Sequence, residues 1–199
     1  MSRLRRRSAT TTHTRRHRRT AVLLTGLATA TGLTLVGASA ASAAPPEITS
    51  GDYYRITGGS SGLAIDVASS STANYARVVQ REVDLESKSQ AWRALRQSDG
   101  AYEFRNANSG KCLSVAGNSN AAGAHLSQRD CNGSDGQLWR LQAGEIDPTA
   151  GCESVLNGLY IDVPGNTQAE NTWLELQPGN GDGGNPGGSQ SFYMVRVDV

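Results

Sequence analysis

The chain has 199 residues, of which 23 are Gly and 6% are aromatic, and its 19 Lys and Arg against 18 Asp and Glu give a formal net charge of +1. This length predicts one globular domain with a single core, and the high glycine content favours many turns over long helices. Eight of the basic residues lie in the first 19 positions, and the remainder after residue 43 carries 11 basic and 18 acidic side chains, a net charge of −7. Nucleic acid and anionic lipid are therefore poor partners, because both select for Lys and Arg patches.

The first 43 residues have the layout of a secretory signal peptide. Residues 1–20 are rich in Arg, residues 22–36 are apolar, and residues 38–43 are all Ala or Ser. We place the cleavage after Ala43, with cleavage after Ala40 as the alternative, and we assign residues 44–51 to a linker. The apolar stretch is shorter than the roughly 18 residues that a membrane span needs. The segment therefore predicts a secreted, extracellular protein with no membrane anchor after cleavage, and leaves the choice between the Sec and twin-arginine routes open.

The rest of the chain repeats itself three times. Residues 61–67 recur in related form at 109–115 and 157–163, which places Gly62, Gly110 and Gly158 at a constant step of 48 residues. The same step relates Ile56, Phe104 and Cys152, and also Gln80 and Gln128, with Gln177 one residue late. Each unit closes with Gln-x-Trp or Gln-x-Phe, at Gln90 to Trp92, Gln137 to Trp139 and Gln190 to Phe192. The repeats therefore span about 52–98, 99–147 and 148–199.

Each repeat is predicted to form four short strands. In the first repeat these are residues 54–56, 63–67, 77–80 and 92–95, separated by polar turns such as 69–71. No stretch after the leader keeps an apolar period of 3.6 residues long enough for a helix. A propeller needs at least four blades, so three units predict a threefold, closed all-β barrel with a cap.

The repeated Gln-x-Trp, with Gly-x-x-x-Asp-Val near the start of a unit, resembles the ricin-B-type lectins, whose fold is the β-trefoil. The resemblance covers about residues 52–199. The third repeat departs from the pattern, because Phe192 replaces the Trp and residues 181–189 lengthen the preceding loop. The resemblance implies that Trp92, Trp139 and Phe192 pack together in a shared core.

The resemblance also implies a shallow sugar site in each repeat. In this family an Asp accepts hydrogen bonds from two sugar hydroxyls, and an aromatic ring about fifteen residues later stacks on the sugar. An amide beside the ring, or an Asn before the Gln-x-Trp, completes the site. The first repeat keeps Asp66, Gln80 and Gln90, but it has Arg81 at the ring position and Ser89 at the Asn position.

The other two repeats match the sugar-binding pattern less well. The third repeat keeps Asp162 and Gln190, with Gln177 at the ring position and Ser189 at the Asn position. The second repeat keeps Gln128 and the motif glutamine Gln137, but Ser114 replaces the Asp, and we expect this repeat to be silent; Arg129 stands at its ring position and Gly136 at its Asn position. We rank the first repeat ahead of the third as a carbohydrate site.

Several of these residues also have a structural interpretation. Asp66 and Asp162 fit turn capping as well as a ligand role. Tyr75 and Trp173 can supply a ring from an unusual direction, although an exposed loop residue and a peripheral packing residue describe them better. The motif glutamines, Gln90, Gln137 and Gln190, are better explained as scaffold.

The missing stacking ring predicts weak binding, on the order of millimolar. Arg81 can partly replace the ring, because a planar guanidinium lies against a sugar or pairs with an acidic one. We therefore expect a glycan partner, with an acidic polysaccharide such as a uronic-acid polymer favoured at Asp66.

Three cysteines follow the leader. Cys112 and Cys131 are 19 residues apart in one repeat and are expected to form a disulfide, which export permits. A metal site is the alternative, but no Cys-x-x-Cys or His-x-x-x-His pattern supports it. Cys152 aligns with Ile56 and Phe104 and is expected to be a buried free thiol.

The residue inventory does not support an enzyme. The part after residue 43 contains one histidine, His125, which falls at the repeat position held by Arg77. Asp66 and Asp162 belong to different thirds of the barrel, whereas a glycosidase needs its carboxylates about 5–10 Å apart. We therefore expect a monomeric lectin without catalytic residues, metal or cofactor. The alternatives are a trefoil whose decayed sugar sites leave it binding protein, for example as an inhibitor, and an accessory lectin acting beside a separate secreted glycosidase.

Overall fold

The structure, a computed structural model, describes residues 47–144, 149–181 and 186–199. The expected signal peptide, residues 1–43, lies outside the described residues. Within the described ranges, no helix is both long enough and apolar enough to cross a membrane.

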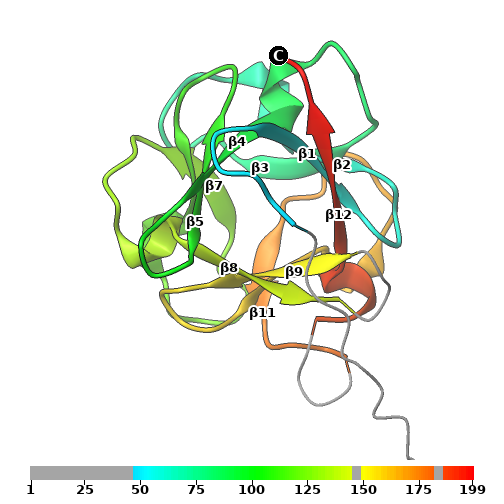
Figure 1. The fold of residues 1–199 in the computed structure, drawn as a ribbon. Helices are drawn as coiled ribbons and strands as arrows, with labels where there is room; N and C mark the ends of the chain where they lie inside the picture. Colours follow the sequence, from blue (N-terminus) through cyan, green and yellow to red (C-terminus); the bar gives the residue numbers. More distant parts are fainter. Residues whose placement is uncertain (1–46, 145–148, 182–185) are drawn as a thin grey trace, which may run out of the picture. The chain divides into compact units, whose positions relative to one another are not determined.

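The described residues form twelve strands, four from each repeat (Figure 1). The strands are β1 (Tyr53–Gly58), β2 (Ala64–Val67), β3 (Val78–Arg81), β4 (Ala91–Arg96), β5 (Tyr102–Asn106), β6 (Cys112–Val115), β7 (Leu126–Arg129), β8 (Trp139–Ala143), β9 (Ala150–Ser154), β10 (Tyr160–Asp162), β11 (Glu175–Gln177) and β12 (Phe192–Val197). The helical segments in these ranges are three-residue 3-10 turns, at Ala68–Ser70, Lys88–Gln90, Ala116–Asn118, Asp135–Gln137, Pro164–Asn166 and Gly188–Gln190.

Six of the strands close a barrel and the other six cap it. Antiparallel pairs run from β1 to β4, β5, β8, β9, β12 and back to β1. The hairpins β2–β3, β6–β7 and β10–β11 form the cap, one from each repeat. This arrangement is a β-trefoil, which confirms the fold class predicted from the repeats.

The hairpin register corrects one detail of the repeat alignment. Ile65 pairs with Gln80, Leu113 with Gln128, and Ile161 with Leu176. The residue equivalent to Gln80 is therefore Leu176, and the placement of Gln177 beside Gln80 and Gln128 is wrong. The step of 48 residues holds without an insertion, and a buried position accepts either a hydrogen-bonded amide or an apolar side chain. Gln177 instead corresponds to Arg81 and Arg129.

Gln80 and Gln128 join neighbouring repeats. The Gln80 Nε2 donates to the carbonyls of Thr167 and Ala169, both at 2.9 Å, in the third repeat. The Gln128 Nε2 donates in the same way to Ser71 and Ala73 of the first repeat. Each glutamine therefore fixes the loop of another repeat against its own hairpin.

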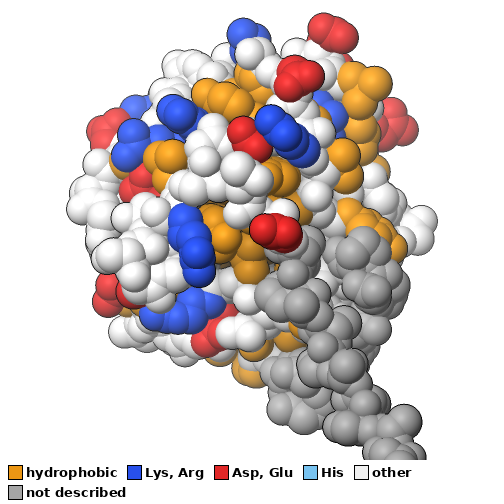
Figure 2. Space-filling view, viewed as in Figure 1, with side chains coloured by type: hydrophobic (Ala, Val, Ile, Leu, Met, Phe, Trp, Pro, Cys, Tyr) orange, Lys and Arg blue, Asp and Glu red, His pale blue; other side chains and the backbone are white. Residues whose placement is uncertain are grey.

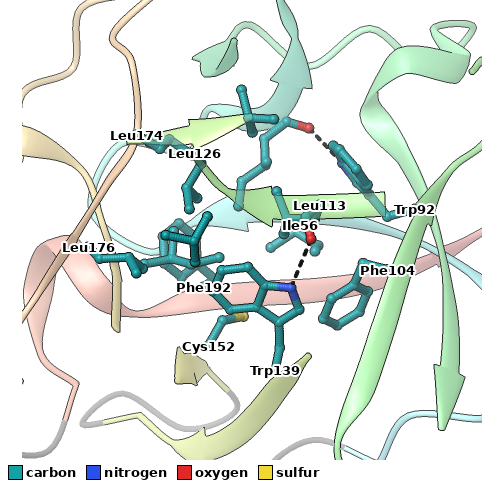
Figure 3. Close-up of a cluster of buried hydrophobic side chains, with 14 of the residues drawn as sticks. Ile56, Trp92, Phe104, Leu113, Leu126, Trp139, Cys152, Leu174, Leu176 and Phe192 are labelled. Atoms are coloured by element: carbon teal, nitrogen blue, oxygen red, sulfur yellow. Dashed lines mark hydrogen bonds between the residues drawn. The ribbon is translucent and has the colours of Figure 1, made fainter. Parts of the chain in front are cut away.

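The Gln-x-Trp positions meet in one core. Trp92, Trp139 and Phe192 are buried in a single cluster with Ile56, Phe104 and Cys152 (Figure 3). The Trp92 indole donates to the Ile65 carbonyl at 3.0 Å, and the Trp139 indole donates to the Leu113 carbonyl at 3.3 Å. Phe192 keeps the packing but has no N–H to donate in this way.

The structure pairs Cys112 with Cys131, as the sequence predicts, and leaves Cys152 free and buried. Burial raises the pKa of the Cys152 thiol to about 12, so this side chain stays a neutral thiol in the folded protein. The disulfide ties the first strand of the β6–β7 hairpin to the residues after its second strand.

Replacing both disulfide cysteines, Cys112→Ala with Cys131→Ala, is expected to lower the free energy of unfolding by about 3 kcal/mol, because the unfolded chain loses a cross-link. Urea unfolding followed by tryptophan fluorescence measures this change. The variant should also become insensitive to dithiothreitol, whereas reduced wild-type protein should match it. A loss below about 1 kcal/mol would show that the bridge contributes little.

Candidate functional site

Two surface pockets lie beside the cap hairpins of the first and third repeats. The pocket of the first repeat has a volume of about 330 Å³, and it is lined by Asp66, Ser70, Arg81, Glu82, Asp84, Ser87, Gln90 and Glu170. The pocket of the third repeat has a volume of about 470 Å³, and it is lined by Asp162, Gly165, Asn166, Glu175, Gln177, Pro178, Asn180, Ser189 and Gln190. Each pocket contains the aspartate that the sequence singled out in that repeat.

The Asp66 carboxylate is buried and held in a fixed orientation. Only 4% of the residue is exposed. The Ser89 hydroxyl donates to its Oδ1 at 2.5 Å, and the Gln90 Nε2 lies 3.4 Å from its Oδ2. In the sequence, Ser89 is only a departure from the Asn of the family pattern, whereas in the structure it makes the shortest hydrogen bond to Asp66.

The motif glutamines hold the loop that borders each pocket. The Gln90 side chain accepts from the Asp84 N–H at 2.9 Å and donates to the Glu82 carbonyl at 2.8 Å. The glutamines of the other repeats make the same pair of bonds, Gln137 with Asn132 and Asp130, and Gln190 with Asn180 and Pro178. Gln90 and Gln190 thus line a pocket while serving as its scaffold.

Arg81 is already engaged by two carboxylates. Its Nε lies 3.9 Å from Asp66 and 3.9 Å from Glu170, and its side chain is 37% exposed. Four carboxylates line this pocket against one guanidinium. The local charge therefore favours a neutral sugar over the acidic one that Arg81 suggested from the sequence.

Two other residues predicted for the first site lie elsewhere. Gln80 does not line the Asp66 pocket, because its amide is directed to the loop of the third repeat. Tyr75 also lies outside it, with its ring against Arg129 of the second repeat. The hairpins pair edge to edge across repeats, so the loop before β3 reaches the next hairpin. The residue that reaches the Asp66 pocket in this way is Glu170, and no pattern within the first repeat could have indicated it.

Asp162 is held like Asp66 but has no cationic partner. The Ser189 hydroxyl donates to its Oδ2 at 2.8 Å, and the Asn180 side chain donates to Ser189 at 2.8 Å. Among the ion pairs of the described residues, none involves Asp162. Burial, with a contribution from nearby Glu175, raises the pKa of Asp162, while the hydrogen bonds from Ser189 and Gln190 oppose the shift.

Gln177 is one of the residues that line this third-repeat pocket. Its Nε2 donates to the Glu175 carboxylate at 2.8 Å. The amides of Gln177, Asn166 and Asn180 give the pocket donors as well as acceptors. This mixed lining suits uncharged hydroxyl groups.

The second repeat lacks the same arrangement. Ser114 is fully buried, accepts from the Gln137 Nε2 at 2.9 Å and donates to the Cys112 carbonyl. The serine that precedes the motif glutamine in the other repeats is replaced here by Gly136. A Cβ added at Gly136 would lie 2.5 Å from the Oδ1 of Asn118, so a serine does not fit at this position without a shift of Asn118. The aspartate and the serine therefore occur together in the first and third repeats, and both are absent from the second repeat.

Trp173 is a packing residue. Its ring stacks on His125 with centroids 3.9 Å apart, and the Arg77 guanidinium lies 5.5 Å from its centroid. Its indole N–H donates to the Leu126 carbonyl at 2.6 Å. The Trp173 ring and the His125 ring thus cover one face of each other, so we do not count either as a candidate ligand contact.

The metal alternative finds little support in the described ranges. The group of side chains there that is spaced to hold an ion is Glu103, Cys112 and Cys131. Both sulfurs of this group are joined in the disulfide.

Figure 2 shows acidic and basic side chains intermixed over the face in view, without a continuous basic patch.

Asp162→Asn is expected to stabilise the protein at neutral pH. A raised pKa means that the folded state favours the protonated carboxyl over the ionised one. The stability that the protonated carboxyl contributes is complete below the usual pKa of 3.8 and is lost as pH rises through the folded pKa. The advantage of the variant should therefore disappear in acid. Thermal unfolding over a pH series measures it.

Asp130→Asn is the matched control with the opposite sign. Hydrogen bonds from Lys111 and Asn74 hold the pKa of Asp130 below its usual value of 3.8. Its ionised form therefore stabilises the fold above that pH, and the contribution is lost as pH falls through the folded pKa. Asp130→Asn should therefore be less stable than the wild-type protein at neutral pH. Equal pH profiles of stability for the two variants would contradict the opposite pKa shifts of Asp162 and Asp130.

Comparison with known proteins agrees with this geometry. A family model described as a ricin-type beta-trefoil lectin domain-like family matches residues 47–117 and 88–177. No curated protein matches the chain.

Many solved structures are similar. A designed threefold-symmetric protein, ThreeFoil, is 28% identical with a TM-score of 0.65, and the match covers 74% of this chain and 99% of that one. An exo-β-1,3-galactanase from Clostridium thermocellum is 28% identical with a TM-score of 0.66, covering 76% of this chain and 31% of the enzyme, so the chain spans about a third of that enzyme's length. The Macrolepiota procera ricin B-like lectin, solved with lactose, is 20% identical with a TM-score of 0.62, covering 76% of this chain and 99% of the lectin, and shows a shared fold. Since the family model spans more than half of the chain and the barrel has the same architecture, the chain belongs to the ricin-type β-trefoil lectin domain-like family.

Proposed function

We propose that the protein is a secreted, non-catalytic lectin that binds neutral sugars in the pockets of Asp66 and Asp162. The observation that carries the proposal is the repeated arrangement of a buried carboxylate, fixed by the serine of the Gln-x-Trp turn, within an open pocket. The leader-like sequence of residues 1–43 supports secretion.

The chemistry of the pockets suits vicinal hydroxyl groups. A carboxylate has about four acceptor positions, and the serine and glutamine use only part of this capacity in each repeat. Two sugar hydroxyls can donate to the remaining positions, and a charged acceptor makes such bonds stronger than neutral ones. The additional carboxylates and amides then supply contacts at the pocket rim.

The composition of the pockets also sets the strength of binding. None of the residues lining either pocket is aromatic, so no ring covers the apolar face of a sugar. Without that desolvated contact, we expect a dissociation constant on the order of millimolar for a single sugar. Two pockets on one domain raise the strength of binding to a polysaccharide.

The site geometry supports binding rather than catalysis. Asp66 and Asp162 lie in different repeats, and each is held by its own serine and glutamine. His125 is stacked against Trp173. The lectin solved with lactose supports a galactoside as the first ligand to test, and the galactanase, part of whose chain has this fold, supports the accessory variant of the hypothesis.

The test is a titration with lactose followed by amide chemical shifts. The wild-type protein should show shifts near Ser89 and near Ser189. Asp66→Asn should remove the first set and Asp162→Asn the second, because an amide cannot accept from two hydroxyls while keeping the serine bond. Ser114→Ala, in the repeat without a carboxylate, is the matched control and should leave both sets unchanged.

Two results would contradict this proposal. Either both variants keep the wild-type shifts, or the wild-type protein shows no response to lactose or to a panel of neutral glycans. In those cases the trefoil with decayed sugar sites becomes the better explanation.

A further inference from the structure

We propose a second kind of site, in which Tyr75 and Arg129 bind an acidic sugar at the seam between the first and second repeats. It rests on the proposed function only in that the ligand is a glycan, and it uses neither Asp66 nor Asp162. Tyr75 precedes β3, and its ring meets Arg129 at the end of β7.

Tyr75 occupies a backbone position that tyrosine disfavours. The positions equivalent to it are Gly123 and Asn171, and all three have positive φ, 66° for Tyr75, 80° for Gly123 and 60° for Asn171. Each donates its N–H to the next hairpin, Tyr75 to the Gln128 carbonyl at 2.8 Å. Gly and Asn adopt this left-handed conformation readily, whereas an aromatic residue is strained there.

Burial does not compensate for this strain. Tyr75 is 66% exposed, whereas every other Phe, Trp and Tyr among the described residues is buried or half-buried. Strained backbone positions cluster at functional sites, so the observed outlier points to a function for the side chain. The open ring is therefore a candidate surface for the apolar face of a sugar.

Arg129 supplies the charge that an acidic sugar needs. Its Cζ lies 5.2 Å from the centroid of the Tyr75 ring, and no ion pair of Arg129 occurs among the described residues. The equivalent Arg81 is held between two carboxylates. A guanidinium that stacks on a ring keeps its N–H edge available for a bidentate bond to a carboxylate.

The carboxylate next to Arg129 in the chain is bonded to other side chains. Asp130 lies next to it but is occupied by the Lys111 ammonium at 2.5 Å and by Asn74, with which it exchanges two hydrogen bonds of 2.6 and 2.8 Å. The bonds between Asn74 and Asp130 also fix the residue before Tyr75. The seam is thus an exposed aromatic ring beside a guanidinium that makes no ion pair among the described residues, and the ligand it fits is a pyranose that carries a carboxylate, such as a uronic acid.

The test measures binding of short oligogalacturonides, with neutral galactose oligosaccharides as the comparison. Tyr75→Asn and Arg129→Gln copy the residues of the third repeat, and each should weaken oligogalacturonide binding by about tenfold. Arg81→Gln is the matched control and should change it less than about twofold. Tyr75→Asn should also keep or raise the melting temperature, because Asn relieves the backbone strain.

The result is independent of the two neutral-sugar pockets. The double variant Asp66→Asn with Asp162→Asn should bind oligogalacturonides as the wild type does, even if it loses lactose. The proposal is overturned if wild-type protein does not bind oligogalacturonides, or if Tyr75→Asn and Arg129→Gln bind them as tightly as wild type. A Tyr75→Asn variant that is less stable and binds normally would show that the tyrosine is structural.

Discussion

One buried side chain in each repeat, the glutamine of the Gln-x-Trp turn, connects the core to the surface. Its amide accepts from one backbone N–H and donates to one carbonyl of the loop after the third strand, as Gln90 does with Asp84 and Glu82. A buried amide that lost these partners would leave several polar groups unsatisfied at once. The loop that borders the pocket is therefore fixed wherever this glutamine is present.

The residues on either side of the glutamine extend this link in opposite directions. Two positions after it, Trp92 enters the core and donates to the Ile65 carbonyl, which secures the second strand. One position before it, Ser89 donates to Asp66 on that same strand. A four-residue turn thus fixes the barrel, the hairpin and the site carboxylate together in the first repeat. The third repeat keeps the serine bond, from Ser189 to Asp162, but its Phe192 has no N–H to donate to the second strand.

The threefold arrangement lets the repeats diverge at the surface while sharing one core. Equivalent core positions accept Ile56, Phe104 and Cys152, because the combined volume is what the barrel must fill. The equivalent positions at the ends of the cap hairpins hold Arg81, Arg129 and Gln177. Arg81 meets Glu170 and Arg129 meets Tyr75, both from loops of other repeats, whereas Gln177 bonds to Glu175 of its own repeat. One fold therefore presents a carboxylate-rich pocket, an aromatic surface beside a cation and a pocket lined by amides.

The sequence predicts what lies within a repeat better than what lies between repeats. The step of 48 residues, the closing Trp and the pairing of Cys112 with Cys131 all follow from local pattern, and the structure has each of them. Glu170 at the first pocket and Tyr75 at the next seam depend on how the hairpins pair across repeats, which no local period encodes. The link between Ser89 and Asp66 does have a signal in the sequence, because both residues are replaced together in the second repeat, by Gly136 and Ser114. The family pattern, which has an Asn at the serine position, does not predict it.

The most direct test of the lectin proposal is a crystal structure of the protein soaked with lactose. Galactose hydroxyls are expected within hydrogen-bond distance of the Asp66 and Asp162 carboxylates, with Ser89 and Ser189 still bound to them, and no sugar is expected at Ser114. Sugar bound away from both aspartates, or at Ser114 with both pockets accessible and empty, would contradict it.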